Sequence, residues 1–196
     1  LEQDLSFYDI RNHQGFLRNL IIRYATTGEL MVNLCVGYHD QEAIRAVMNS
    51  LIKAFPEITS LMYTVNTKVN DSIYDLEPVL YHGKGFIMEH LENYQFKIGP
   101  KSFFQTNTRQ GELLYQVTRE YAGLTGQEVL YDLYCGTGSI GIFCSEGASK
   151  VIGVEVIGEA VEDARINASL NQIDHAHFFH GDVSDICNEA FFAAHG

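Results

Sequence analysis

Three glycines and two carboxylates near the middle of the chain form the pattern with the clearest chemical meaning. The segment VLYDLYCGTGSIGIF, residues 129–143, contains Gly136, Gly138 and Gly141 in a G-x-G-x-x-G spacing. It begins as an expected strand and ends as an expected helix, which is the setting this motif requires. Glycine lets the backbone approach a ligand closely, and a helix start offers free N–H groups. The segment therefore predicts a nucleotide-type ligand at the end of a strand.

Three carboxylates bear on which ligand this turn holds. Glu155, 19 residues after Gly136 and at the end of the next expected strand, can accept hydrogen bonds from both hydroxyls of a ribose. Asp132, four residues before the first glycine, suits an ammonium group and would repel a pyrophosphate. Asp182, in FFHGDV after a third expected strand, can accept a hydrogen bond from an adenine amino group. These positions favour S-adenosylmethionine. A nicotinamide or flavin dinucleotide, or a turn that only allows close packing, are the alternatives.

The second half of the chain alternates between strand and helix patterns. Expected strands are EVLYDLY, KVIGVEV and HAHFFHGD, separated by expected helices SIGIFCSEG and GEAVEDARINASLNQ. An earlier helix, in NTRQGELLYQVTREYAGL, carries an apolar stripe of Leu113, Leu114, Val117 and Tyr121. Such alternation is typical of parallel βαβ units. We expect residues 100–196 to be the N-terminal part of an α/β, Rossmann-like domain, incomplete because only about three strands are present.

The first part of the chain, residues 1–95, predicts an α+β domain with an antiparallel sheet. GFLRNLIIRYATTGELMVNLCVGY indicates a hairpin around Thr26–Gly28, and ITSLMYTVN, GFIMEHL and YQFKIG indicate further short strands. Between them, DQEAIRAVMNSLIKAF predicts a helix that Asp40 caps and that ends before Pro56. Its apolar face consists of Ile44, Val47, Met48, Leu51 and Ile52.

Composition narrows the class of protein. The chain has 196 residues, 46% of them hydrophobic, and a net charge of −12, which argues against a protein that coats nucleic acid through a basic surface. Its apolar runs are too short for a membrane span. Four scattered cysteines without metal-type spacing indicate a reduced, cytoplasmic protein. A first residue of Leu1 suggests a piece of a longer chain.

Two segments carry a resemblance to a known family. DLYCGTGSIGIF, together with IGPKSFFQTNTRQGELLYQV about thirty residues earlier, resembles the RNA uracil-5-methyltransferase family. GFLRNLIIR and TGELMVNL look like the central domain of that family, so the resemblance runs from about Gly15 to Asp182. It implies an S-adenosylmethionine-dependent methyltransferase domain, with a uridine of ribosomal (23S) or transfer RNA as substrate and partner.

The resemblance also assigns cofactor contacts. It places them on Gln105, Tyr134 and Ser139, besides Glu155 and Asp182. Gln105 can donate and accept hydrogen bonds to the methionine end, Tyr134 offers an apolar face beside the sulfonium, and backbone groups around Ser139 can anchor the carboxylate. Gln105 as a polar residue at a helix entry, and Tyr134 as a core residue, are the alternatives. The expected cofactor site is Gln105, Asp132, Tyr134, Gly136, Gly138, Ser139, Glu155 and Asp182.

The catalytic residues of the family are not expected in this chain. The family's nucleophilic cysteine follows an Asp-Pro-Pro-Arg segment, and its glutamate base comes later, whereas the prolines here are Pro56, Pro78 and Pro100. No catalytic residue and no metal ligand is therefore predicted, and we expect a fragment that binds cofactor without turnover. The other functions considered are a methyltransferase for a different substrate that shares the cofactor turn, and a non-catalytic RNA-binding module.

Overall fold

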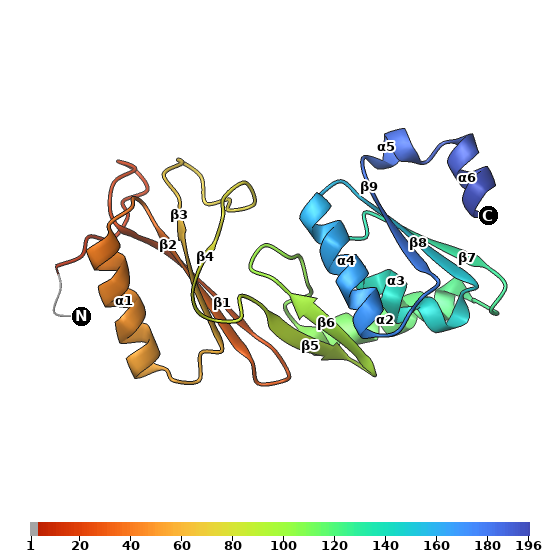
Figure 1. Ribbon diagram of the computed structural model, residues 1–196, viewed down its shortest axis with the longest axis horizontal. Coiled ribbons are helices and arrows are strands. Elements are labelled where there is room, and N and C mark those ends of the chain that lie inside the picture. Colours follow the sequence, from red (N-terminus) through yellow and green to blue (C-terminus); the bar gives the residue numbers. More distant parts are fainter. Residues whose placement is uncertain (1–3) are drawn as a thin grey trace. The chain divides into compact units, whose positions relative to one another are not determined.

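The structure, a computed structural model, describes residues 4–196, which form two compact units (Figure 1). The first comprises the chain through Ile87 together with Gly99–Lys101, and the second comprises Met88–Ile98 and Ser102–Gly196. The sequence predicts the boundary between the two parts near residues 95–100. The hairpin of residues 88–98, most of which precedes that boundary, packs with the second unit. In residues 4–196 no helix combines the length and the apolar character needed to cross a membrane.

A four-stranded sheet and one helix make up the first unit. Its strands are β1 (Leu17–Tyr24), β2 (Leu30–Val36), β3 (Ser60–Val65) and β4 (Val79–Gly83), in that spatial order. The β1–β2 and β3–β4 pairs are antiparallel, but β2 and β3 are parallel. The expectation of an antiparallel sheet is thus wrong for the central pair. The reason is α1 (Gln41–Ala54), which crosses over and returns the chain in the same direction.

The helix α1 has the cap and the buried face that its sequence predicts. The Asp40 carboxylate accepts hydrogen bonds from the N–H groups of Glu42 and Ala43, at 3.1 and 3.0 Å. Ile44 and Met48 are fully buried on the face that packs on β2 and β3. The core of the unit is a cluster of apolar residues from β2, α1 and their neighbours: Phe16, Val32, Leu34, Val36, Ala43, Ile44, Val47, Met48, Ile58 and Leu61.

Arg18, on β1, holds the segment after β3 in place. Its side chain is 1% exposed, and its guanidinium donates to the carbonyls of Asn66, Lys68 and Asn70 and to the carboxylate of Asp71. The fork of five N–H donors in arginine suits this many acceptors. Arg18 is therefore a structural residue.

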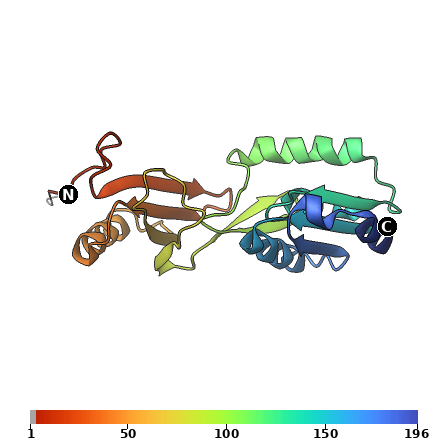
Figure 2. The ribbon, with the colours of Figure 1, turned by 90° about the horizontal axis from the view of Figure 1, so that it is seen from above.

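The second unit contains a hairpin and a parallel sheet with helices around it. The hairpin is formed by β5 (Ile87–Leu91) and β6 (Tyr94–Ile98), and the sheet by β7 (Val129–Leu133), β8 (Lys150–Glu155) and β9 (Ala176–His180), in that order. Both sheet pairs are parallel, as expected for βαβ units. The helical segments are α2 (Thr108–Ala122), α3 (Ser139–Phe143), η1 (Ser145–Gly147), α4 (Gly158–Leu170), α5 (Val183–Ile186) and α6 (Glu189–His195). Figure 2 shows α2 and α4 on opposite sides of the sheet.

The helix α2 packs on a face other than its aliphatic stripe. Gly111 and Tyr115 are its buried residues, whereas all four residues of the stripe, from Leu113 to Tyr121, are exposed. Arg119 pairs with both carboxylate oxygens of Glu92 at 2.9 and 3.0 Å, and its guanidinium lies 4.6 Å from the centroid of the Phe143 ring. Aromatic and polar contacts to the hairpin and α3 thus orient the helix, while the apolar stripe seen in the sequence is exposed among residues 4–196.

Candidate cofactor site

The eight residues expected at the cofactor site all belong to the second unit, at the carboxyl ends of its parallel strands or beside them. Asp132 lies near the end of β7 and Glu155 at the end of β8, while Asp182 follows β9. Because parallel strands end at the same edge of a sheet, these three carboxylates gather there. The N–H of Gly181 donates to the carbonyl of Glu155 at 2.9 Å, which ties the exit of β9 to that edge.

The glycine turn is shaped by close packing and by positive φ angles. Gly138 has φ +75°, and a Cβ there would lie 3.0 Å from the Phe178 ring and 3.1 Å from Cβ of Ala164. A Cβ on Gly141 would lie 3.0 Å from Oδ2 of Asp132. Glycine at both positions lets α3 sit directly against β7 and against the residues behind the sheet.

Tyr134 directly precedes this turn in a strained conformation. It has φ +64° and a 73% exposed side chain. A bulky residue with positive φ is uncommon, and such strain is concentrated at functional sites. Tyr134 is therefore no core residue, which removes the alternative role considered for it, and its exposed ring remains available to a ligand.

Asp132 is held beneath α3. Its Oδ2 accepts a hydrogen bond from the N–H of Gly141 at 2.8 Å. Burial raises the pKa of Asp132 to about 6, and the nearby charge of Glu155 adds to the rise, while the hydrogen bond from Gly141 opposes it. The site thus concentrates negative charge, and residues 129–143 contain no Lys or Arg. Such an environment fits a cationic ligand better than a pyrophosphate.

Glu155 connects the turn to the start of the next segment. It is buried, and its Oε2 accepts from the N–H of Gly136 at 3.0 Å while Oε1 accepts from the N–H of Ile157 at 2.9 Å. Each carboxylate oxygen has two lone pairs, so one remains on each for a ligand hydroxyl. These two bonds fix the orientation of the carboxylate before any ligand arrives.

Ser139 and Asp182 each have an evident structural partner. Ser139 is buried at the start of α3, and its Oγ lies 2.9 Å from the hydroxyl of Tyr115 on α2. Asp182 caps α5, because its Oδ1 accepts from the N–H and the hydroxyl of Ser184 at 2.8 and 2.7 Å. These hydrogen bonds lower the pKa of Asp182, so it is ionised at neutral pH.

Gln105 reaches the same region through α2. A Cβ on Gly111 would lie 2.9 Å from Cβ of Gln105, and Tyr115, one turn further along α2, contacts Ser139. Asn107 caps α2 by accepting from the N–H of Gln110 at 3.2 Å. The cap at this helix entry is thus Asn107, and Gln105 is half-buried on the side of α2 that meets α3.

Two groups that sequence reasoning missed support the turn from behind. Tyr115 supplies the contact to Ser139, and Asn167, on α4, donates from Nδ2 to the carbonyl of Thr137 at 3.1 Å. Asn167 is fully buried beside Ala164 and Ala168. A polar residue on the apolar face of a helix was the signal that could have found it, because such a residue needs a specific partner.

The three cysteines of this unit are poor nucleophile candidates. Burial raises the pKa of Cys144 to about 11 and that of Cys135 further, so both thiols are protonated at neutral pH. Cys187 is partly exposed but lies between α5 and α6. Among residues 4–196, no group of three or more His, Cys, Asp or Glu side chains is placed to hold a metal ion.

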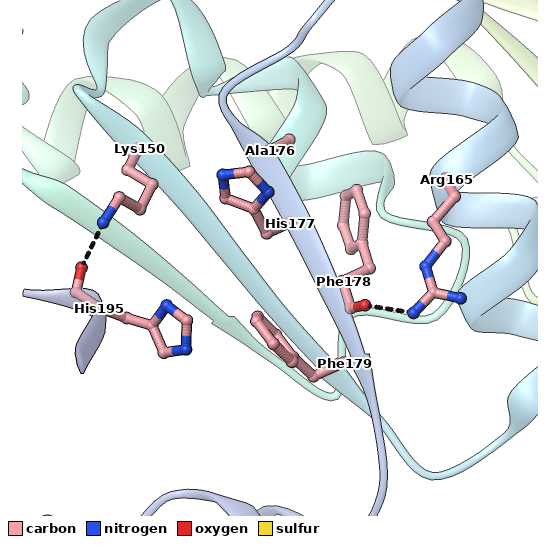
Figure 3. Close-up of a pocket in the computed structure, with 7 residues that line it drawn as sticks. All are labelled: Lys150, Arg165, Ala176, His177, Phe178, Phe179 and His195. Atoms are coloured by element: carbon pink, nitrogen blue, oxygen red, sulfur yellow. Dashed lines mark hydrogen bonds between the residues drawn. The ribbon is translucent and has the colours of Figure 1, made fainter. Parts of the chain in front are cut away.

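A pocket of about 450 Å³ lies elsewhere in the unit, along β9 (Figure 3). Its lining residues are Lys150, Arg165, Ala176, His177, Phe178, Phe179 and His195. None of the eight expected site residues is among them. Arg165 donates to the carbonyl of Phe178 at 2.7 Å, and Lys150 donates to the carbonyl of His195 at 2.9 Å. Arg165 thereby satisfies a carbonyl of β9, which lies at the edge of the sheet.

Comparison with known proteins identifies the family. The family model described as tRNA (Uracil-5-)-methyltransferase matches residues 22–189. The chain belongs to the tRNA (uracil-5-)-methyltransferase family. The expectation drawn from the DLYCGTG and SFFQTN segments is thus confirmed.

Relatives and solved structures agree with this family. Proteins described as uncharacterized RNA methyltransferases, from Bacteroides thetaiotaomicron and Porphyromonas gingivalis, are 47% and 50% identical over 100% and 97% of this chain. The chain spans 44% and 41% of their lengths, which is less than half.

Among solved structures, the tRNA (uracil-54, C5)-methyltransferase of Pyrococcus abyssi in complex with S-adenosyl-L-homocysteine has a TM-score of 0.75 and 30% identity. The match covers 92% of this chain and 43% of that one. The tRNA m1G37 methyltransferase of M. jannaschii shares the fold. It is 17% identical, with a TM-score of 0.55, and the match covers 95% of this chain and 55% of that one. The second unit is thus part of a Rossmann-like methyltransferase fold, as expected.

Proposed function

We propose that this chain binds S-adenosylmethionine as the cofactor-binding part of an RNA uracil-5-methyltransferase, with a uridine of tRNA or 23S rRNA as the substrate. The observation that carries the proposal is the glycine turn between Asp132 and Glu155. Two carboxylates there adjoin a turn whose segment contains no basic residue, and the pKa of Asp132 is raised. A cationic sulfonium nucleoside compensates this charge, whereas a dinucleotide would increase the repulsion.

The proposed contacts follow the chemistry of the cofactor from one end to the other. Asp132 binds the ammonium group, and the backbone around Ser139 binds the carboxylate. Gln105 and Tyr134 line the methionine end. Glu155 accepts from the ribose hydroxyls, and Asp182 accepts from the adenine amino group. Gly136 and Gly138 leave room for the nucleoside. The bound cofactor supplies an electrophilic methyl group, and the residues of this chain hold and orient it.

We further propose that this chain does not supply the thiolate that activates the uracil ring. The support is the state and place of its cysteines. Cys35, Cys135 and Cys144 are buried, and burial raises the pKa of each thiol, while Cys187 lies between α5 and α6, away from the glycine turn in the sequence. A thiol protonated at neutral pH is a weak nucleophile. We also propose a cytoplasmic location, because tRNA and rRNA are found there and the cytoplasm keeps thiols reduced.

Calorimetric titration tests the cofactor assignment directly. S-adenosylmethionine and S-adenosylhomocysteine are expected to bind the chain with a stoichiometry of one, and NAD is expected not to bind. Glu155→Gln is the variant expected to weaken binding. Glu159→Gln, in the first turn of α4, is the control. Binding of NAD in preference to S-adenosylmethionine would refute the proposal, as would equal binding by both variants.

Substrate class needs a separate measurement. Filter binding with a tRNA transcript, a 23S rRNA fragment and a DNA duplex of matched length, at several salt concentrations, compares the three. The proposal predicts preference for an RNA that presents an unpaired uridine, because the target base has to be free of base stacking to reach the methyl group. Binding to DNA as strong as to both RNAs would contradict it.

A further inference from the structure

The helix α4 and its C-cap residue present a row of three polar residues, each four residues apart, toward the hairpin and the glycine turn. They are Asp163, Asn167 and Asn171, called here the α4 polar row. Neither a cofactor contact nor a catalytic function was expected of them. Each makes hydrogen bonds to a different segment of the second unit.

The two asparagines pair with β6 as a neighbouring strand would. Asn171 accepts from the N–H of Gln95 at 2.8 Å and donates to its carbonyl at 2.7 Å. Asn167 accepts from the N–H of Lys97 at 2.7 Å and lies 3.5 Å from its carbonyl. Four helical residues rise about 6 Å, and two strand residues span about 6.8 Å, so the two repeats match. Carboxamides of a helix thus complete the free edge of a strand.

Asn167 makes one contact that Asn171 does not. Its Nδ2 also donates to the carbonyl of Thr137, in the middle of the glycine turn, at 3.1 Å. Asn167 is 0% exposed, so water cannot replace any of these bonds. A single buried carboxamide therefore joins the glycine turn to β6.

Asp163, one turn earlier, holds the segment that follows β6. Its Oδ2 accepts from the hydroxyl of Ser102 at 2.9 Å, and its Oδ1 pairs with Nζ of Lys97 at 3.2 Å. Ser102 is the first residue of SFFQTN, which contains Gln105. The polar row thus fixes both parts of the proposed cofactor site: the glycine turn through Asn167, and the Gln105 segment through Asp163.

We propose that Asn167 is a positioning residue for cofactor binding, which sets the distance between the glycine turn and β6, the strand that leads into the segment of Gln105. This inference rests on the proposed function, since it concerns the same site. Asn167 itself does not touch the ligand. It acts by holding the carbonyl of Thr137 and the backbone of Lys97 on one rigid group.

Asn167→Asp and Asn171→Asp form a matched pair of variants. Each keeps an acceptor for the N–H on β6 and loses the donor, but only Asn167→Asp removes the bond to Thr137. We expect Asn167→Asp to raise the dissociation constant of S-adenosylmethionine about tenfold, which corresponds to about 1.4 kcal/mol. Asn171→Asp is expected to change it less than about twofold, a difference below about 0.5 kcal/mol.

Hydrogen exchange of the chain without ligand separates a local effect on the glycine turn from a general loss of stability. In Asn167→Asp, exchange at the N–H groups of Gly136 and Gly138 should accelerate relative to that of Val151 in β8. In Asn171→Asp the ratio should stay as in the wild type. A uniform acceleration in both variants would mean that Asn167 only stabilises the unit, and would overturn the proposal. An unchanged dissociation constant in Asn167→Asp would also overturn it.

A second variant covers the case in which a buried carboxylate at position 167 prevents folding. Ser102→Ala removes the bond to Asp163 with little loss of volume, and it should weaken S-adenosylmethionine binding about threefold, or about 0.6 kcal/mol, without affecting exchange in the glycine turn. Unchanged binding would overturn the function of the polar row. Failure of the wild-type chain to bind S-adenosylmethionine would instead refute the proposed function, and the exchange ratio would still decide whether Asn167 holds the turn.

Discussion

Replacing Asp132 by asparagine should stabilise the fold and weaken the binding of the cofactor. Burial raises the pKa of this carboxyl from 3.8 to about 6, so the folded state binds the proton more tightly than the unfolded state does. The resulting contribution to stability is fully present below pH 3.8 and is lost as the pH rises through about 6. At about 1.4 kcal/mol per pH unit, the ionised carboxylate lowers the unfolding free energy at pH 7 by at most about 3 kcal/mol.

The asparagine variant removes that charge and keeps an oxygen for the N–H of Gly141. At pH 7 we expect Asp132→Asn to raise the unfolding free energy by about 1 to 3 kcal/mol, and at pH 4 to change it little. Binding of S-adenosylmethionine should weaken about tenfold or more, because the ammonium loses a charged partner. Urea unfolding and calorimetry at pH 5, 6 and 7 measure both quantities.

The two pH profiles of the wild type have opposite signs, which makes the reasoning easy to refute. From pH 5 to 7 the stability should fall while the affinity for S-adenosylmethionine rises, and both slopes should flatten in Asp132→Asn. Glu128→Gln is the control. Glu128 is an exposed carboxylate whose pKa is lowered to about 2 by hydrogen bonds from Thr125. It is not one of the proposed cofactor contacts, and its replacement should not change the affinity. An Asp132→Asn variant that is destabilised at pH 7, or that binds as the wild type does, would contradict the reasoning.

Three further predictions concern packing and reactivity. Gly138→Ala places a Cβ 3.0 Å from the Phe178 ring at φ +75° and should lower the unfolding free energy by about 2 to 4 kcal/mol, measured by urea denaturation; a smaller loss than that of an exposed-loop alanine control would refute it. Arg18→Lys cannot satisfy the four acceptors of the buried guanidinium, so it should destabilise the first unit by about 2 to 4 kcal/mol and leave S-adenosylmethionine affinity unchanged. An Ellman titration of the native chain should modify Cys187 rapidly and the three buried cysteines only on unfolding; fast reaction of a second thiol would contradict the burial.

Local sequence determined the parts of this protein whose cause is local. The cap of α1 at Asp40 and its buried face follow from residue types and a helical period. The strands β7, β8 and β9 are short, mostly apolar segments that alternate with helical segments along the chain, and they form as expected. The glycine turn is set by Gly138, because few other residues adopt its backbone angles. The family itself was evident from two short segments at a fixed spacing.

Tertiary structure decided what depends on partners distant in the chain. The parallel pairing of β2 with β3, and the strand β4, arise from crossover and edge packing that short segments do not encode. The exposure of the Leu113–Tyr121 face reflects which side of α2 found partners. Asn167 is the clearest case: its sequence neighbours give a helix, but only the fold brings it to Thr137 and Lys97, 30 and 70 residues away. Periodicity specifies which face of an element is apolar, whereas a hydrogen bond needs a partner at about 3 Å, and only the folded chain supplies that distance.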